Sequence, residues 1–174
     1  MLEAKNGFVA FESALHVFGT CNVAGDYSID EWNAQDLWRS HYGDLVDGCF
    51  FFAEDVFAMQ FAMKDNVIWS FDAETGALTK MAESMEGWAS ALLADHAYLT
   101  GFPMAHSWQS ANRPLALKER LFPKYPFVLG GKFELSNIVA SNAARGMQFR
   151  GFLAQELRNL PDGTRVTLEF DPLQ

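Results

Sequence analysis

The chain has 174 residues, of which 49% are hydrophobic and 14% aromatic, enough for one domain with a sizeable core. It contains no run of about 18 apolar residues, which excludes a membrane-spanning helix, and residues 1–7 lack the charged-then-apolar layout of a secretion signal. Cys21 and Cys49 sit in no metal-ligand spacing. We therefore expect a reduced, cytoplasmic protein with no membrane contact, although a disulfide stays open.

The negative charge is concentrated in the first half of the chain. The net charge is −9, yet residues 1–95 hold 16 acidic and 4 basic side chains, whereas residues 96–174 hold 6 acidic and 9 basic ones. An acidic half argues against direct binding of nucleic acid, because phosphates would be repelled. It suits a basic protein partner, and the simpler alternative is an acidic, solvated face on a soluble protein.

The first expected elements are a strand and a helix. Residues 14–18 have the composition of a strand that Gly19 closes. Ser28 and Glu31 then have capping-box spacing, and a loose apolar stripe follows them as far as Gly43. We predict a helix over residues 29–42 that packs Trp32 and Trp38 on a sheet.

The stretch from Cys49 to Gly76 predicts a β-meander. Residues 50–52 form its lead strand, residues 56–63 alternate between two apolar faces, and residues 67–71 alternate again after a polar turn. Because both faces of this pattern are apolar, we expect helices to cover the sheet on both sides.

The second half predicts fewer clear elements. Residues 78–81 favour a short strand, Ser84 can cap a helix over residues 85–96, and residues 101–112 have no clean period. Four more segments follow in order: a short helix over 115–121, a strand over 134–140, a helix over 143–160 that Asn142 caps, and a strand over 164–170. The fold class is α+β: a central, mostly antiparallel sheet flanked by helices, with a C-terminal helix-and-strand extension.

Motifs for catalysis or cofactor binding are missing from the sequence. It lacks the phosphate-binding, dinucleotide-binding, nucleophile-elbow and zinc-protease patterns, and its four histidines are scattered. We expect no cofactor and no metal. Glu54 and Asp55 are the best carboxylate pair, but adjacent strand residues point to opposite faces. We therefore expect one of them to cap a turn, and we expect Asp72 and Glu74 to be turn formers.

An ordered series of short motifs resembles the SUKH superfamily, which includes the fungal Smi/Knr cell-wall regulators and many bacterial toxin-immunity proteins. The resemblance covers about residues 6–96, and the later part resembles the C-terminal extension of some bacterial members. The residues that carry it are Asn6-Gly7, Phe52, Asp55, Phe57, Val67, Phe71-Asp72, Glu74-Thr75-Gly76, Ser84 and Trp88, followed by residues 121–124, 126–131 and 160–164.

The resemblance implies a single α+β domain over residues 1–174, with its core at about 6–96 and the extension at about 97–174. It implies no catalytic residues, and bacterial relatives commonly neutralise a cognate toxin, often a nuclease. Two departures are visible. Only five residues precede Asn6, where the family usually has one or two helices, and Ala58 stands where the family often has glycine. A partner or a second copy of the chain could cover the flank that those helices would leave.

We weigh three functions. The first is a non-enzymatic immunity protein that binds a basic toxin through its acidic surface, as a monomer or a homodimer. The second is a regulatory protein-interaction scaffold of the Smi/Knr type, and the third is an enzyme that uses Glu54 or Asp55 with a histidine. For the first function, the expected partner-binding residues are exposed acids that flank the sheet: Asp30, Glu31, Asp36, Asp44, Asp47, Glu54, Asp55, Asp72 and Glu74.

Overall fold

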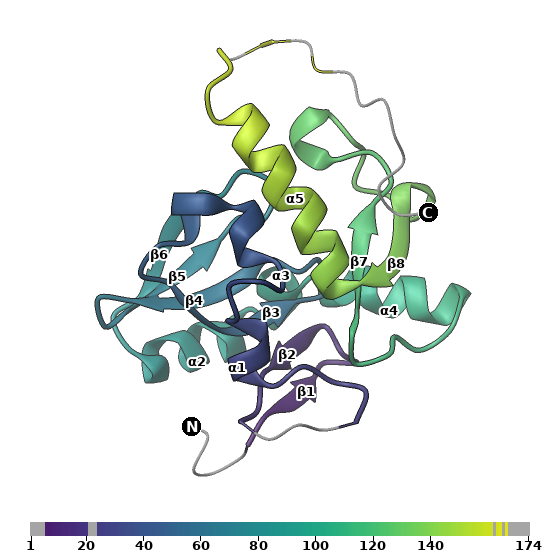
Figure 1. Ribbon diagram of the computed structural model, residues 1–174. Coiled ribbons are helices and arrows are strands. Elements are labelled where there is room, and N and C mark those ends of the chain that lie inside the picture. Colours follow the sequence, from purple (N-terminus) through teal and green to yellow (C-terminus); the bar gives the residue numbers. More distant parts are fainter. Residues whose placement is uncertain (1–5, 21–23, 162, 165, 167–174) are drawn as a thin grey trace.

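The computed structural model describes residues 6–20, 24–161, 163, 164 and 166, and it confirms the α+β class (Figure 1). Across this part of the chain, six strands form an antiparallel sheet in which spatial order follows sequence order. Each strand pairs with the next one along the chain, so the sheet is a meander. The connection before the third strand, residues 18–49, is long, and the other connections are short. Its strands are β1 (Phe8–Ala10), β2 (Leu15–Val17), β3 (Phe50–Asp55), β4 (Gln60–Lys64), β5 (Val67–Phe71) and β6 (Leu78–Ala82).

The turns of the meander follow the predicted chemistry, with one shift. Asp65 and Asn66 take φ of +52° and +61°, the left-handed pair that a tight hairpin between twisted strands needs. The strand expected over residues 56–63 begins only at Gln60. The reason is Asp55, whose carboxylate holds residues 56–59 in a turn. Ala58 has φ +57° there, a conformation that glycine adopts without strain, and this is where the resembled family often has glycine.

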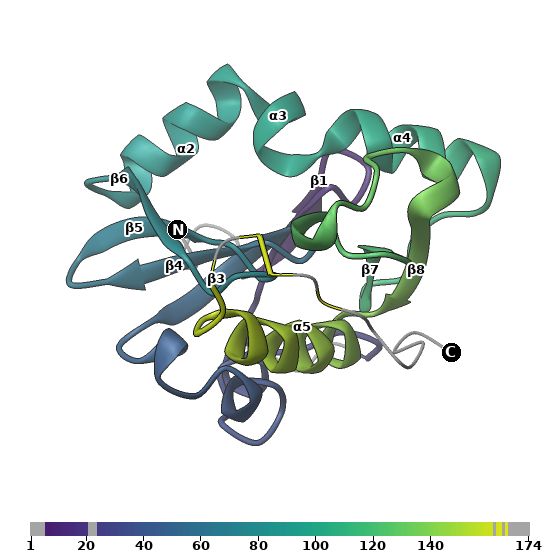
Figure 2. The ribbon, with the colours of Figure 1, turned by 90° about the horizontal axis from the view of Figure 1, so that it is seen from above.

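One face of the sheet is covered by three consecutive helices: α2 (Met85–Ala94), α3 (His96–Thr100) and α4 (Phe102–Ala111) (Figure 2). Ser84 caps α2 as expected, since its hydroxyl accepts the N–H of Gly87. Trp88 of α2 lies edge-on to Phe52 and Phe61 of the sheet, at centroid distances of 5.0 and 5.5 Å. Helix α4 was not predicted, because its ten residues mix polar and apolar side chains without a clean stripe.

The opposite face is covered by α1 (Ile29–Trp32), two 3-10 turns (Arg39–His41 and Gly43–Val46) and α5 (Ala143–Leu157) (Figures 1 and 2). The rings of Trp32, Trp38 and Tyr42 are fully buried here, and Trp38 packs edge-on against Phe51 at 5.1 Å. Phe51 and Phe52 thus serve opposite faces, as the alternation of a strand requires.

The prediction of one helix over residues 29–42 is wrong in its length. Asn33 ends α1 because its side-chain amide donates to the carbonyls of Ile29 and Phe51 and its oxygen accepts the N–H of Phe51. An asparagine that bonds backbone in this way competes with the helix. The chain therefore follows the sheet in short turns rather than in one helix, and the tryptophans still reach the core.

The later half departs further from the expectation. The short helix predicted over residues 115–121 is wrong, because Glu119–Pro123 is a strand, β7, that pairs antiparallel with β8 (Ile138–Asn142). The strand predicted over residues 134–140 begins only at Ile138, after a 3-10 turn. Asn142 caps α5 as predicted, by accepting the N–H of Arg145. Most of the predicted strand over residues 164–170 lies outside the described residues.

The extension completes the core rather than standing beside it. Phe122, Met147 and Ala154 belong to the same buried cluster as the meander, and Gln148 donates to the carbonyl of Leu37 at 2.6 Å. The N–H of Leu121 bonds the carbonyl of Val56 at 2.7 Å, which joins the small sheet to the meander. Helix α5, with α1 and the two 3-10 turns, thus covers the face of the sheet opposite α2, α3 and α4.

We expect that Gly146→Ala destabilises the fold by about 1–3 kcal/mol. A methyl group at Gly146, on the buried side of α5, would overlap the ring of Phe122. The matched control is Gly87→Ala in α2, where the nearest atom is a methyl group 3.3 Å away. There the gain in helix propensity, up to about 1 kcal/mol, offsets the crowding. Urea unfolding of both variants measures the difference, and equal stability would show that α5 does not pack closely on β7.

Candidate functional site

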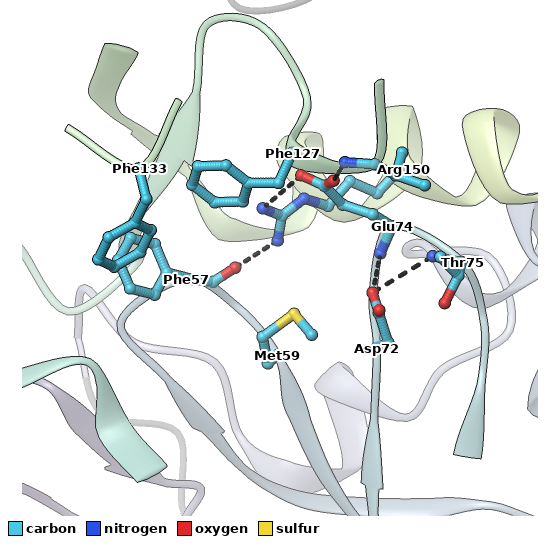
Figure 3. Close-up of a pocket in the computed structure, with 9 residues that line it drawn as sticks. Phe57, Met59, Asp72, Glu74, Thr75, Phe127, Phe133 and Arg150 are labelled. Atoms are coloured by element: carbon cyan, nitrogen blue, oxygen red, sulfur yellow. Dashed lines mark hydrogen bonds and ion pairs between the residues drawn. The ribbon is translucent and has the colours of Figure 1, made fainter. Parts of the chain in front are cut away.

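The candidate site lies at the end of the sheet where β3 turns into β4. Adjacent carboxylates there, Glu54 and Asp55, point to different surroundings, and the side chains of the later half close over them. Figure 3 shows the outer part of the site: the rings of Phe57, Phe127 and Phe133 on one side, and Arg150 beside Glu74 on the other.

Glu54 is the centre of a buried charge network and is only 1% exposed. Its Oε1 lies 2.8 Å from Nε of Arg120 and 3.3 Å from Nδ1 of His16. Its Oε2 accepts a hydrogen bond from the amide of Gln60 at 3.1 Å. The other nitrogen of His16 lies 3.1 Å from the carboxylate of Asp26. The network thus links β2, β3, β4 and β7 through their side chains.

The network also shifts the pKa values of His16 and Glu54. Burial tends to lower the pKa of His16, but hydrogen bonds to Asp26 and Glu54 outweigh it, and the pKa is raised above its ordinary value. Burial tends to raise the pKa of Glu54, but the guanidinium of Arg120 and the contacts with His16 outweigh it, and the pKa is lowered. Glu54 is therefore a buried carboxylate held ionised by its cations, and its partners are provided within the fold.

Asp55 holds the turn between β3 and β4. Its Oδ1 accepts the N–H groups of Phe57 and Met59 at 2.8 and 2.9 Å, which confirms that one residue of the pair caps a turn. Burial is the largest influence on this carboxyl and raises its pKa to about 7, against the opposing effects of the two N–H groups and of Arg150. Because its pKa is about 7, Asp55 changes between its protonated and ionised forms near neutral pH.

Glu74 and Arg150 form a second buried ion pair, with Nη2 of Arg150 at 3.4 Å from Oε1 of Glu74 (Figure 3). Arg150 also donates to the carbonyl of Phe57, and Oε2 of Glu74 accepts the N–H of Val128 at 2.7 Å. Asp72 is a turn former as predicted, because it accepts the N–H groups of Glu74 and Thr75. Glu74 is not one, since its carboxylate ties the meander to α5 and to the loop at Val128.

Hollows open on both sides of Phe133, whose ring is 62% exposed and packs on Phe57 and Phe127 at 5.3 and 5.6 Å. The first hollow has a volume of about 370 Å³ and lies over the Arg150–Glu74 pair, with Met59 in its wall. The second has a volume of about 560 Å³ and lies between the β3–β4 turn and the helices α3 and α4. Phe57 and Phe133 line both of them.

Glycines shape the approach to these hollows. Gly101, between α3 and α4, has φ +68°, and a Cβ there would lie 2.5 Å from the ring of Phe57. Only glycine lets the helices come so close to the β3–β4 turn. Gly131 has the same role against the backbone carbonyls of Tyr125 and Pro126, and it closes the loop that carries Phe133.

The expected partner-binding residues separate into two groups. Glu54, Asp55 and Glu74 were expected to be exposed, and this is wrong, because the later half buries them against Arg120 and Arg150. Asp72 is half-buried in its turn. The other five expected residues are exposed, and all of them lie in the segment between β2 and β3: Asp30, Glu31, Asp36, Asp44 and Asp47.

Other reactive side chains do not gather into a site within the described ranges. No group of three histidine, cysteine, aspartate or glutamate side chains there could hold a metal ion. Cys49 is a buried free thiol, and Cys21 lies outside those ranges. His16 and Glu54, a pair that the enzyme hypothesis would use, do meet, but as buried members of the charge network. No helix in the described part is both long and apolar enough to cross a membrane.

The sequence missed the residues that form the hollows, notably Tyr98, Phe133 and Arg150. An available signal was Gly130-Gly131, which marks a sharp turn just before an aromatic residue. Arg150 carries a weaker signal, a lone charge among the buried positions of an otherwise apolar helix face. Their meeting at one place could not be read from the sequence, since 76 positions separate Glu74 from Arg150.

Comparison with known proteins supports the fold alone. No family model and no curated protein match this chain. Among solved structures, the chain is similar to that titled "Crystal structure of Atu4351 from Agrobacterium tumefaciens", with a TM-score of 0.55 and 12% identity. The similarity covers 87% of this chain and 72% of the other. At this identity the match shows a shared arrangement of strands and helices.

We predict that Glu54→Gln lowers the free energy of unfolding by about 3–5 kcal/mol. The change keeps the shape of the side chain but leaves Arg120 and His16 without the buried anion between them. Asp47→Asn, at an exposed acid, is the control and should change stability by less than about 0.5 kcal/mol. Thermal and urea unfolding measure both, and a Glu54→Gln protein as stable as the control would contradict the role of the network.

Asp55 should make stability depend on pH. Its pKa is about 7 in the folded protein and 3.8 as a free side chain, so the folded state binds the extra proton between these values. The stability that this carboxyl contributes is therefore present below pH 4 and is lost as pH rises to 7. Asp55→Asn keeps the acceptor oxygen for the turn and removes the proton, so its stability relative to wild type should rise by about 2–4 kcal/mol over this window. A difference that stays constant across pH would refute the assignment.

Proposed function

We propose that this chain is a non-enzymatic immunity protein that binds and neutralises a cognate toxin, a basic protein of the nuclease type. The observation that carries the proposal is the exposed acidic surface of residues 28–48, which we call the acidic segment. It contains α1 and the two 3-10 turns, which lie on the face of the sheet opposite α2, α3 and α4. The sequence resemblance to the immunity branch of the SUKH superfamily supports the same function.

The acidic segment holds five acids and only one arginine or lysine. All five acids are exposed, whereas Arg39 turns inward, where it donates to the carbonyls of Val46 and Cys49 and lies over the ring of Phe51. Asp44 is bound by Arg158 of the extension. The negative potential of the other four acids is therefore turned outward.

A nuclease fits this surface because it must itself be basic where it holds phosphates. Opposite potentials speed association and disfavour wrong partners, which is what a protein that must capture a toxin inside its own cell requires. The same negative potential disfavours direct contact with nucleic acid. We therefore place the function at a protein interface in the cytoplasm.

The second candidate is a regulatory scaffold that binds several partners. The observation in its favour is that the molecule has two surfaces of different chemistry, the acidic segment and the aromatic hollows beside Phe133. A scaffold would bind several proteins weakly, whereas an immunity protein binds one partner tightly. Recovery of bound proteins from the producing cells, at low and at high salt, distinguishes the two.

The protein encoded by the neighbouring gene, expressed and purified, should bind this chain with an affinity that depends on the acidic segment. The test variant reverses Asp30, Asp36 and Asp47 to lysine. It leaves Glu31, whose carboxylate closes the capping box with Ser28. We expect the association rate to fall at least tenfold at low salt, because steering by opposite charge is lost. Surface plasmon resonance measures it, and protection of cells that express the toxin is the functional assay.

The matched control reverses three acids outside the segment: Glu83, Glu86 and Glu156, all of them exposed. It changes the net charge equally, so an equal loss of binding would mean that overall charge matters and the segment does not. If the neighbouring protein is neither toxic nor bound, the immunity function itself is refuted.

A further inference from the structure

The second hollow combines aromatic walls with carboxylates, and we call it the acid–aromatic hollow. The β3–β4 turn, the start of α3, the α3–α4 corner and the loop of Phe133 surround it, and its volume is about 560 Å³. The residues that line it are Asp55, Phe57, Asp95, Ala97, Tyr98, Gly101, Pro103, Met104 and Phe133.

Asp55 places a carboxylate in the wall of this hollow. Asp55 is only 7% exposed, and its Oδ1 accepts the N–H groups of Phe57 and Met59. Burial raises the pKa of this carboxyl to about 7, because a carboxylate withdrawn from water is costly in its charged form. A positively charged group in the hollow would favour the ionised form of Asp55.

Asp95 adds a second carboxylate at the same hollow. It caps α3, where its Oδ1 accepts the N–H of Tyr98 at 3.2 Å. The side chain of Asp95 is exposed, so it can meet a partner without a change in the fold. Two carboxylates in one concave place favour a cation and oppose an anion.

Aromatic rings line the same hollow. Tyr98 is 82% exposed and Phe133 62%, although both line the hollow with the buried Phe57. Aromatic faces attract the ammonium and guanidinium groups of lysine and arginine. The apolar walls of Pro103 and Met104 suit the methylene stem of such a side chain, since lysine and arginine bury the stem and keep the charge at a polar end.

We propose that the acid–aromatic hollow receives a lysine or arginine side chain of a protein partner, with the cation against Asp55 and Asp95 and the stem between Tyr98 and Phe133. This inference deepens the proposed function and rests on it for the identity of the partner, the basic toxin. A neutral apolar side chain would fill the same space but would leave both carboxylates without a counter-charge. The hollow would thus anchor one side chain, while the acidic segment steers the approach.

The first experiment tests the hollow without any toxin. Nα-acetyl-lysine methylamide is titrated into the isotopically labelled protein at pH 8, above the pKa of Asp55, and the isosteric norleucine derivative serves as the uncharged probe. We expect the lysine probe to shift the resonances of Tyr98, Asp95 and Phe133 with millimolar affinity and the norleucine probe to bind at least tenfold more weakly. Equal binding of the two probes, or no binding of the lysine probe, would overturn the inference.

Variants confirm where the probe binds. Asp55→Asn with Asp95→Asn removes both charges but keeps the acceptor oxygens that hold the turn and cap α3, and it should weaken the lysine probe at least tenfold. Tyr98→Ala should weaken it severalfold, whereas Leu93→Ala, at an exposed residue of α2 outside the hollow, should leave it unchanged. A probe that binds all of these proteins alike would lie elsewhere and refute the assignment.

The same variants are then tested against the toxin, which separates the two proposals. If the toxin dissociates from the Asp55→Asn/Asp95→Asn variant no faster than from the wild type, the partner does not use the hollow and the inference is overturned. If the lysine probe binds the hollow but no neighbouring toxin binds the chain, the cation site stands and the immunity function fails. Loss of toxin affinity in the double variant, through faster dissociation, supports both.

Discussion

The buried pairing of Glu54 with Arg120 is the interaction on which the rest of the structure depends. It places an ionised carboxylate in the interior of the meander and supplies its counter-charge from a strand 66 positions later. A buried ion pair contributes little net stability, because desolvation offsets the attraction, but either charge alone is costly. The acidic first half of the chain therefore depends on the basic second half for the counter-charges of its buried carboxylates. The same logic repeats at Glu74 and Arg150, so the charge asymmetry along the sequence is partly a set of internal contacts.

Local chemistry made the meander and the caps predictable. The turn at Asp65 and Asn66, the Ser84 and Asn142 caps and the strand over residues 67–71 all follow from side chains within a few positions of one another. Longer-range contacts defeated the other predictions. Asn33 ends a helix by bonding to β3, and the segment Glu119–Pro123 is drawn into a strand by pairing with Ile138–Asn142. The local amino-acid composition does not indicate contacts between residues so far apart in the sequence.

The candidate site shows the same division. Asp55 and Asp72 are turn formers because carboxylates accept N–H groups two residues on, and the sequence suffices for that. Glu54 and Glu74 are buried because arginines far along the chain pair with them. Since those contacts are not visible in the local sequence, both glutamates were expected to be exposed. The hollows arise between three segments that glycines allow to approach closely, Gly101 against Phe57 above all. What remains exposed is an acidic segment on one face and an aromatic opening beside Phe133.

The sequential order of the meander has a consequence for how the chain folds. The strands from β3 to β6 pair across short connections, so this part of the sheet can form early and at low entropic cost as the chain leaves the ribosome, whereas β2 and β3 are separated by residues 18–49. Until Arg120 and Arg150 emerge, however, Glu54 and Glu74 lack their cations, and the face beneath α5 is open to water. Synthesis of the last third is thus the step that locks the domain. Before it, the nascent chain exposes apolar surface and is vulnerable to aggregation, which makes chaperone contact most valuable at that stage.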